Sequence, residues 1–226
     1  ILNPGAQDNL LVGRATYNVE DLRPEISSSG NRVEIRTPNL EIGGIPKFGD
    51  NYINQWDFQL IDDVLLDLTI NAGAYKSNLE LGGLMLENLS VTDGAADVDV
   101  SFSRPNQVAM EMLRYETGAS SVDLSGLANA NFESMIFKGG AGEYTLDFSG
   151  ELRQSATVDI DSGVSSVTLI VPGDVNARVF YDGGLTNVDI SGNWEKSGND
   201  YIQSGDGPRI TFNVNIGAGN LEIRNR

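Results

Sequence analysis

Apolar and polar residues alternate with a period of two along most of residues 71–226, and the alternation restarts after a repeated glycine. The copies include GAADVDV, GASSVDL, GVSSVTL and GLTNVDI, and each has the form Gly-small-x-x-apolar-x-apolar. A period of two is typical of strands with one buried face, and no segment sustains a helical period. The chain is therefore predicted to be all-β. The repeated glycines are Gly73, Gly94, Gly118, Gly140, Gly163, Gly184 and Gly217.

The glycines recur roughly every 22 residues, with one longer gap before the last of them. A second apolar alternation, such as Met110–Met112 or Met135–Phe137, precedes most of them. Each unit then reads as strand, loop, strand and glycine turn. A strand repeat of this length predicts a parallel β-solenoid, or β-helix-like stack, of about seven short coils. An antiparallel sandwich of hairpins is the competing fold, and the fixed register of one motif favours the solenoid.

Equivalent positions of the copies should form columns along the stack, with coils about 4.8 Å apart. Two columns are expected to point inward and the residue between them outward. The first inward column is Val98, Val122, Tyr144, Val167, Val188 and Leu221. The second is Val100, Leu124, Leu146, Leu169, Ile190 and Ile223. The outward column is Asp99, Asp123, Thr145, Thr168, Asp189 and Glu222.

Residues 1–70 are less regular and are expected to start and cap the solenoid, because an open end would expose an edge strand. At the other end, the charges of Arg224-Asn225-Arg226 would discourage edge association. No change of composition marks a linker, so residues 1–226 are expected to form one domain with the repeats at 71–226. The strand-like stretches before the repeats are Leu10–Val12, Arg32–Ile35, Leu40–Ile42, Trp56–Leu60 and Leu65–Ile70.

Several runs resemble the bacterial toast-rack family, which is related to the C-terminal domain of LiaF-type cell-wall-active antibiotic response proteins. They include TYNVEDLRPEISSSGNRVEI, NQWDFQL, LDLTINAGAYKSNLELGGLMLENLSVTDGAADVDVSFSRPNQ and DYIQSGDGPRITFNVNIGAGNLEI. The resemblance implies a right-handed β-solenoid in cell-envelope proteins, mostly of unknown function, that often carry a leader or anchor. LiaF-type members are membrane-associated and repress an envelope-stress two-component system. The resemblance implies no catalytic residues.

Composition narrows the classes of function. The formal net charge is −17, which argues against nucleic acid or anionic lipid as a partner. The chain has no His and no Cys, so a Ser-His-Asp triad, a thiolate nucleophile and a Cys-zinc site are excluded. No apolar run is long enough to span a membrane. The chain begins at Ile1 without a signal peptide, as a trimmed or mature form would.

Acidic residues are the main candidates for chemistry. Asp62 and Asp63 precede a strand, Asp97 and Asp99 flank an apolar residue, and Asp99 and Asp123 could be neighbours on adjacent coils. Paired carboxylates could serve glycoside hydrolysis, but a solvated acidic face is the favoured interpretation. Calcium is a second possibility, yet the outward column breaks at threonines and the repeat is much longer than nine residues. No catalytic residue, cofactor site or metal site is therefore predicted.

Two further stretches need an interpretation. Ser120, Ser121 and Asp123 could suggest a hydrolytic constellation, but the serine positions vary between copies and are interpreted as a turn and spacer. Trp194 and Tyr201 lie in the insertion GNWEKSGNDYIQSGDGP, where the register breaks at 191–208. They are candidate contacts for a partner. The alternative is that Trp194 covers the flank of the solenoid.

These observations predict a non-enzymatic structural or protein-interaction module of the cell envelope, on the extracytoplasmic side. Its partner would be another protein or a second copy of the chain. Two alternatives remain: a regulatory or sensory domain of an envelope-stress response, and an enzyme acting on polysaccharide.

Overall fold

The computed structural model describes residues 1–5, 8–38 and 52–226 of the chain. Almost all of its regular structure is strand, as predicted. The strands are β1 (Leu2–Pro4), β2 (Leu11–Tyr17), β3 (Glu25–Ser29), β4 (Arg32–Arg36), β5 (Asn54–Leu60), β6 (Leu65–Glu80), β7 (Met85–Ser101), β8 (Met110–Ser125), β9 (Phe132–Asp147), β10 (Ala156–Val171), β11 (Val175–Tyr181), β12 (Leu185–Ser191), β13 (Glu195–Ser197), β14 (Asp200–Gln203) and β15 (Asp206–Asn225). Two short 3-10 helices are η1 (Glu20–Leu22) and η2 (Leu127–Ala130).

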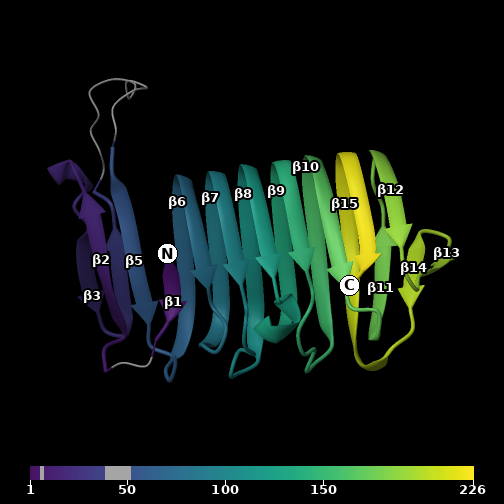
Figure 1. Ribbon diagram of the computed structural model, residues 1–226, viewed down its shortest axis with the longest axis horizontal. Helices are drawn as coiled ribbons and strands as arrows, with labels where there is room; N and C mark the ends of the chain where they lie inside the picture. Colours follow the sequence, from purple (N-terminus) through teal and green to yellow (C-terminus); the bar gives the residue numbers. More distant parts are fainter. Residues whose placement is uncertain (6–7, 39–51) are drawn as a thin grey trace.

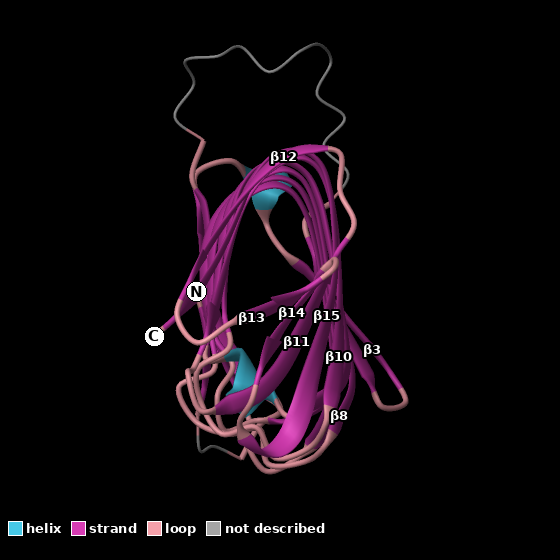
Figure 2. Ribbon diagram, turned by 90° about the vertical axis from the view of Figure 1, so that its right-hand side faces the viewer, coloured by secondary structure: helices cyan, strands magenta, loops and turns pink. Residues whose placement is uncertain are grey.

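Each long strand forms one coil of a flattened solenoid. The strand rises along one side, bends at its repeated glycine and descends along the other side, so that the coils seen end-on outline an oval (Figure 2). We call the half of each coil before the glycine wall A and the half after it wall B. The glycine turn of each sequence repeat is thus a bend within one strand, and the loops lie at the opposite edge of the oval. The β-solenoid predicted from the repeat is confirmed, with seven coils side by side in Figure 1.

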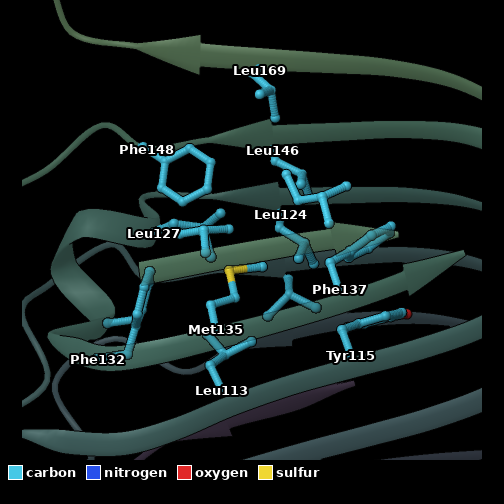
Figure 3. Close-up of a cluster of buried hydrophobic side chains, with 14 of the residues drawn as sticks. Leu113, Tyr115, Leu124, Leu127, Phe132, Met135, Phe137, Leu146, Phe148 and Leu169 are labelled. Atoms are coloured by element: carbon cyan, nitrogen blue, oxygen red, sulfur yellow. The ribbon is translucent and has the colours of Figure 1, made fainter. Parts of the chain in front are cut away.

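The core fills the space between the two walls. Along β8, Leu113 and Tyr115 on wall A and Val122 and Leu124 on wall B are buried. Arg114, between the first two, is half-buried, and Asp123, between the other two, is exposed. Figure 3 shows Leu113, Tyr115 and Leu124 among the side chains of neighbouring coils, such as Met135, Phe137 and Leu146. Both predicted inward columns are buried except at Val188 and Ile190, which are half-buried because they belong to the last coil.

The alternation at Met110–Met112 is not the one that stacks on Met135–Phe137. Leu113 and Tyr115 pair with Met135 and Phe137. Met112 is only half-buried.

The repeated glycines stack directly on one another at the bend. A Cβ atom on any of them after Gly73 would lie no more than 2.8 Å from the carbonyl oxygen of the glycine in the adjoining coil. Real Cβ atoms do not approach an oxygen so closely, so the coils could not close up at the bend with any other residue there. The glycine repeat is therefore a packing requirement of the stack.

The stacking order differs from the chain order at the C-terminal end. β15 lies between β10 and the pair β11 and β12, so the last strand in the chain is not the last coil (Figure 1). Val167 pairs with Leu221, and Leu221 pairs with Val188. This placement fits the burial that each strand needs. The inward side chains of β15 are fully buried, whereas those of β12, Val188 and Ile190, are half-buried and suit an end position. The inward side chains of β11, Ala177 and Val179, are buried because β14 pairs with its far edge.

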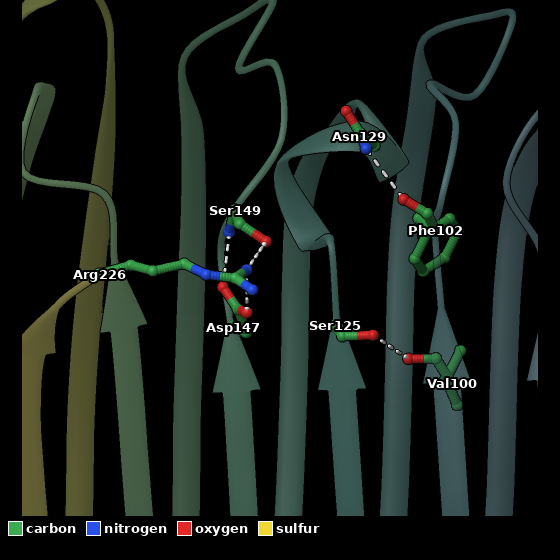
Figure 4. Close-up of polar contacts among 7 residues, drawn as sticks. All are labelled: Val100, Phe102, Ser125, Asn129, Asp147, Ser149 and Arg226. Carbon is green, nitrogen blue, oxygen red and sulfur yellow. Dashed lines mark hydrogen bonds and ion pairs between the residues drawn. The ribbon is translucent and has the colours of Figure 1, made fainter.

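The charged C-terminus therefore does not protect an edge, contrary to the expectation from Arg224-Asn225-Arg226. Arg226 donates hydrogen bonds to Asp147 at 2.9 Å and to Ser149 at 3.0 Å, and so ties the end of β15 to the loop edge near β9 (Figure 4). In the same figure Asn129 donates to the carbonyl oxygen of Phe102 at 2.9 Å, which links the loops of neighbouring coils.

The segment 191–208 is not simply a loop. It contains β13 and β14, which form an antiparallel hairpin, and it includes the first residues of β15. β14 pairs antiparallel with β11 and thus extends wall A beyond the last coil. In Figure 2 the hairpin crosses the mouth of the oval. The sequence break marks the point where the chain leaves the repeat to cover the end of the core.

The N-terminal part extends the other wall. β1 pairs with the second half of β6, β5 pairs with β1, and β2 pairs antiparallel with β5, so wall B gains three strands. β3 and β4 form a separate hairpin that projects from the body (Figure 2). Most stretches predicted before the repeats fall on strands, but β1 and β3 were missed, and Leu40–Ile42 lies outside the described residues. The first coil begins at Leu65 rather than at residue 71.

Asp123→Asn should change the free energy of unfolding by no more than about 0.5 kcal/mol, because Asp123 faces solvent beside Asp99 and Thr145. Loss of a like-charge neighbour across strands favours a slight gain. Urea unfolding followed by tryptophan fluorescence measures the change. A loss above 2 kcal/mol, by the usual scale of such changes, would show that the outward face holds a structured site.

Candidate functional site

A buried carboxylate lies inside the bend, where the glycine column crosses β7 and β8. Asp93 directly precedes Gly94 and is only 6% exposed. Its side chain points inward because it continues the buried alternation of Leu89 and Val91 along β7. Four hydroxyl groups surround it, and we call the five residues the bend cluster. The carboxylate accepts hydrogen bonds from Tyr115 at 2.8 Å, from Ser120 at 3.3 Å, from Tyr75 at 3.5 Å and from Thr117.

The bend cluster holds the carboxylate without a cationic partner, since none of the ion pairs among the described residues includes Asp93. Burial, reinforced by Tyr75 and Asp93, raises the pKa of Tyr115 well above its ordinary value, so Tyr115 remains a hydrogen-bond donor. Buried carboxylates require such donors, because an unsatisfied charge inside a protein is costly. The hydrogen bonds of the cluster link the bends of β6, β7 and β8.

Ser120 lies at the bend, where a turn was expected, and its buried side chain belongs to this cluster. Its hydroxyl accepts a hydrogen bond from the backbone N–H of Ala96 at 2.9 Å, and its oxygen lies 2.6 Å from the hydroxyl oxygen of Thr117. The carboxylate that Ser120 contacts, Asp93, is buried together with it, whereas Ser121 and Asp123 face solvent. The three residues are not brought together as a hydrolytic constellation.

Tyr115→Phe should lower the free energy of unfolding by about 1.5–3 kcal/mol, because it removes a short hydrogen bond to a buried charge. Tyr75→Phe is the matched control. Its hydroxyl is 3.5 Å from the same carboxylate oxygen and half-buried, so a loss of less than about 1 kcal/mol is expected. Chemical denaturation of both variants tests the order of the two effects, and equal losses would contradict the assignment.

The exposed acidic residues do not converge. Asp99 and Asp123 are neighbours in register on the outer face of wall B, as expected, but the residues that continue their row are Thr145 and Thr168. Asp97 forms an ion pair with Lys76, whose ammonium nitrogen lies 2.6 Å from its carboxylate oxygen. Within residues 1–5, 8–38 and 52–226, no three Asp or Glu side chains lie close enough together to hold a metal ion.

Two shallow hollows mark the described surface. One lies on wall B over β12 and β15, and Ser166, Asp189, Asn220 and Glu222 are among its lining residues. The other lies beside η1 and is lined by two ion-paired glutamates, Glu20 with Arg23 at 3.3 Å and Glu25 with Arg36 at 2.8 Å. The first hollow is lined mainly by hydroxyl, amide and carboxylate groups, and the second mainly by charged side chains.

The candidate contacts Trp194 and Tyr201 lie on the hairpin that covers the end of the core. Tyr201 is 8% exposed, and Trp194 is half-buried and packs against the core. Lys196 lies 5.3 Å from the centre of the Tyr201 ring. Both aromatic side chains thus close the end of the solenoid, as in the alternative interpretation for Trp194. Their contact with a partner stays a prediction.

Comparison with known proteins matches the fold to a family. The model of the N-terminal domain of toast_rack, DUF2154, matches residues 2–112 and 105–170. The chain belongs to the toast-rack family. A crystal structure of a "putative cell adhesion protein" from Clostridium sporogenes aligns with all of this toast-rack chain and 87% of its own, with 18% identity and a TM-score of 0.49. No curated protein matches.

The toast-rack chain also holds features that its sequence did not reveal. Asp93 precedes Gly94, and Ser120 is the second residue after Gly118. Both positions face inward, so polar residues at these two positions are the sequence signal that could have revealed the buried cluster. In the part of the chain that the structure describes, no helix is long and apolar enough to cross a membrane.

Proposed function

We propose that this toast-rack domain is a non-enzymatic structural or protein-interaction module of the bacterial cell envelope, formed by one domain and acting outside the cytoplasmic membrane. The observation that carries the proposal is the pair of extended walls over a packed core. Inward positions are filled by side chains, outward positions are mostly polar, and no three of the described carboxylates lie together. Such a stack presents a fixed face to a partner.

Family membership and charge support the same conclusion. The resemblance to LiaF-type proteins supports an envelope location, and a net charge of −17 disfavours nucleic acid and anionic lipid as partners. A rigid face loses little conformational entropy on binding, which favours recognition of a partner over a broad area.

Binding and hydrolysis can be compared on one preparation. The purified chain is mixed with envelope fragments of the bacterium that encodes it, and both cosedimentation and release of sugar reducing ends are measured. We expect saturable binding that is lost when the fragments are first treated with protease, and no release of reducing ends. Release that disappears in the double variant Asp99→Asn, Asp123→Asn would instead establish an enzyme acting on polysaccharide.

A further inference from the structure

The two ends of the solenoid are staggered in opposite senses. At the N-terminal end wall B is extended by β1, β5 and β2, while the wall A half of β6 has a described neighbour only in β7. At the C-terminal end wall A is extended by β14 and β13, while on wall B β12 is paired only with β15. One end thus projects where the other recedes (Figure 1).

Wall B has an unpaired edge strand at each end among the described residues. β2 pairs only with β5, and β12 pairs only with β15. Both strands have seven residues. When two copies are stacked in the same direction, β2 of one copy runs antiparallel to β12 of the other, because β12 follows the direction of β6 and β1, and β2 opposes it. Unpaired edges of this kind are templates for strand addition.

Side-chain direction restricts how these edges can pair. Ala15 and Gly13 lie opposite the inward residues Trp56 and Phe58 and therefore face inward, as do Val188 and Ile190 on β12. Two registers keep these faces inside and pair six residues of each strand. One sets Arg14 opposite Asp189 on the outer face, and the other sets Val12 there. Arg14 is exposed. Asp57 lies opposite it on β5, but Arg14 forms no ion pair among the described residues, so charge complementarity selects the first register.

The inner side of the N-terminal extension is incomplete in one copy. Trp56 and Phe58 contact each other edge to face, yet both are only half-buried, because no described strand of wall A lies opposite them. On the facing end of another copy, the hairpin of β13 and β14 crosses the mouth of the oval and exposes Ile202. Stacking would bring these apolar groups together.

We propose that this domain associates head to tail with a second copy of itself, β2 of one copy adding antiparallel to β12 of the next with Arg14 opposite Asp189. Between β15 of one copy and β6 of the next, wall B then holds four strands and wall A three. The backbone pairing is therefore confined to wall B, and side chains fill the remaining space of about one strand spacing in wall A. The contact leaves a free edge at each end, so assemblies lengthen with concentration. This inference does not depend on the proposed function.

Sedimentation velocity at about 0.15 M salt tests the proposal by charge reversal. The intact chain should form dimers and longer species as its concentration rises to about 100 μM. Arg14→Asp and Asp189→Arg should each weaken association about tenfold, since each places like charges opposite one another. Asp123→Arg, in the same outward column but on an inner coil, is the matched control and should leave association unchanged.

Mixing the two single variants gives a sharper result. Each variant alone carries like charges at positions 14 and 189, which repel one another across the contact. In an equimolar mixture, every contact between the two different variants again joins Arg to Asp, so association should recover. Thermal unfolding confirms that all variants are folded. A chain that stays monomeric over the whole concentration range overturns the proposal, as does association that is indifferent to both reversals.

Discussion

Leu146→Asp is expected to destabilise the fold by at least about 4 kcal/mol, a large share of the stability of an ordinary domain. Leu146 is fully buried in the second inward column, between Leu124 of β8 and Leu169 of β10. The substitution removes its apolar contacts and places a carboxylate among them without a donor. The bend cluster shows that this protein surrounds a buried carboxylate with four hydroxyl groups, and nothing comparable surrounds position 146.

Thr145→Asp is the matched control for that result. It introduces the same side chain one residue earlier, on the outward face opposite Asp123, and should cost no more than about 1 kcal/mol because the new carboxylate stays in water. Differential scanning calorimetry of the two variants should show a fall in Tm of roughly 10 °C or more for Leu146→Asp only. Similar melting of both variants would contradict the inward column.

Gly118→Ala should cost about 3 kcal/mol, although it adds a single methyl group. The new Cβ would overlap the carbonyl oxygen of Gly94, and this contact is between backbones, so no flexible side chain can move aside. Relief requires separating two coils at the bend. That separation would also disturb the bend cluster, because Thr117 and Ser120 lie on either side of the substituted residue.

Gly73 offers the control within the same column. It begins the column, and a Cβ there would meet nothing within 4 Å. Gly73→Ala should therefore be neutral or slightly stabilising, through the lower freedom of the unfolded chain. The difference between the two alanine variants, measured by urea unfolding, isolates the packing of the coils. Equal effects would mean that the glycines serve only local backbone conformation.

The columns of the solenoid could be predicted because strand geometry forces them. Residues such as Val122, Asp123 and Leu124 alternate in and out, and a repeat with a constant register places equivalent residues in line. The period says which residues stack but not which coils are neighbours. The insertion of β15 between β10 and β12 depends on the length of the intervening hairpin and on the burial of whole strands, so spacing alone could not reveal it.

The bend cluster and the open edges needed the structure for a related reason. Asp93 and Ser120 come from different copies, and their meeting depends on how tightly the bend closes. The exposure of β12 follows from the strand order. For the exposed acidic residues, by contrast, the sequence predicted the positions correctly. Asp99 and Asp123 are neighbours as expected, but their row continues with Thr145, so proximity in register did not create a site.

Disulfide cross-linking tests the strand order most directly, since the chain has no Cys of its own. Thr168 pairs with Glu222, and Glu222 pairs with Asp189, whereas Thr168 and Asp189 lie on opposite sides of β15. Paired Cα atoms about 4.8 Å apart suit a disulfide, and those at twice that spacing do not. Cysteines at 168 and 222, or at 222 and 189, should therefore cross-link in the folded protein, and those at 168 and 189 should not. A bond between 168 and 189, with none between 168 and 222, would show that the coils stack in chain order and would contradict this structure.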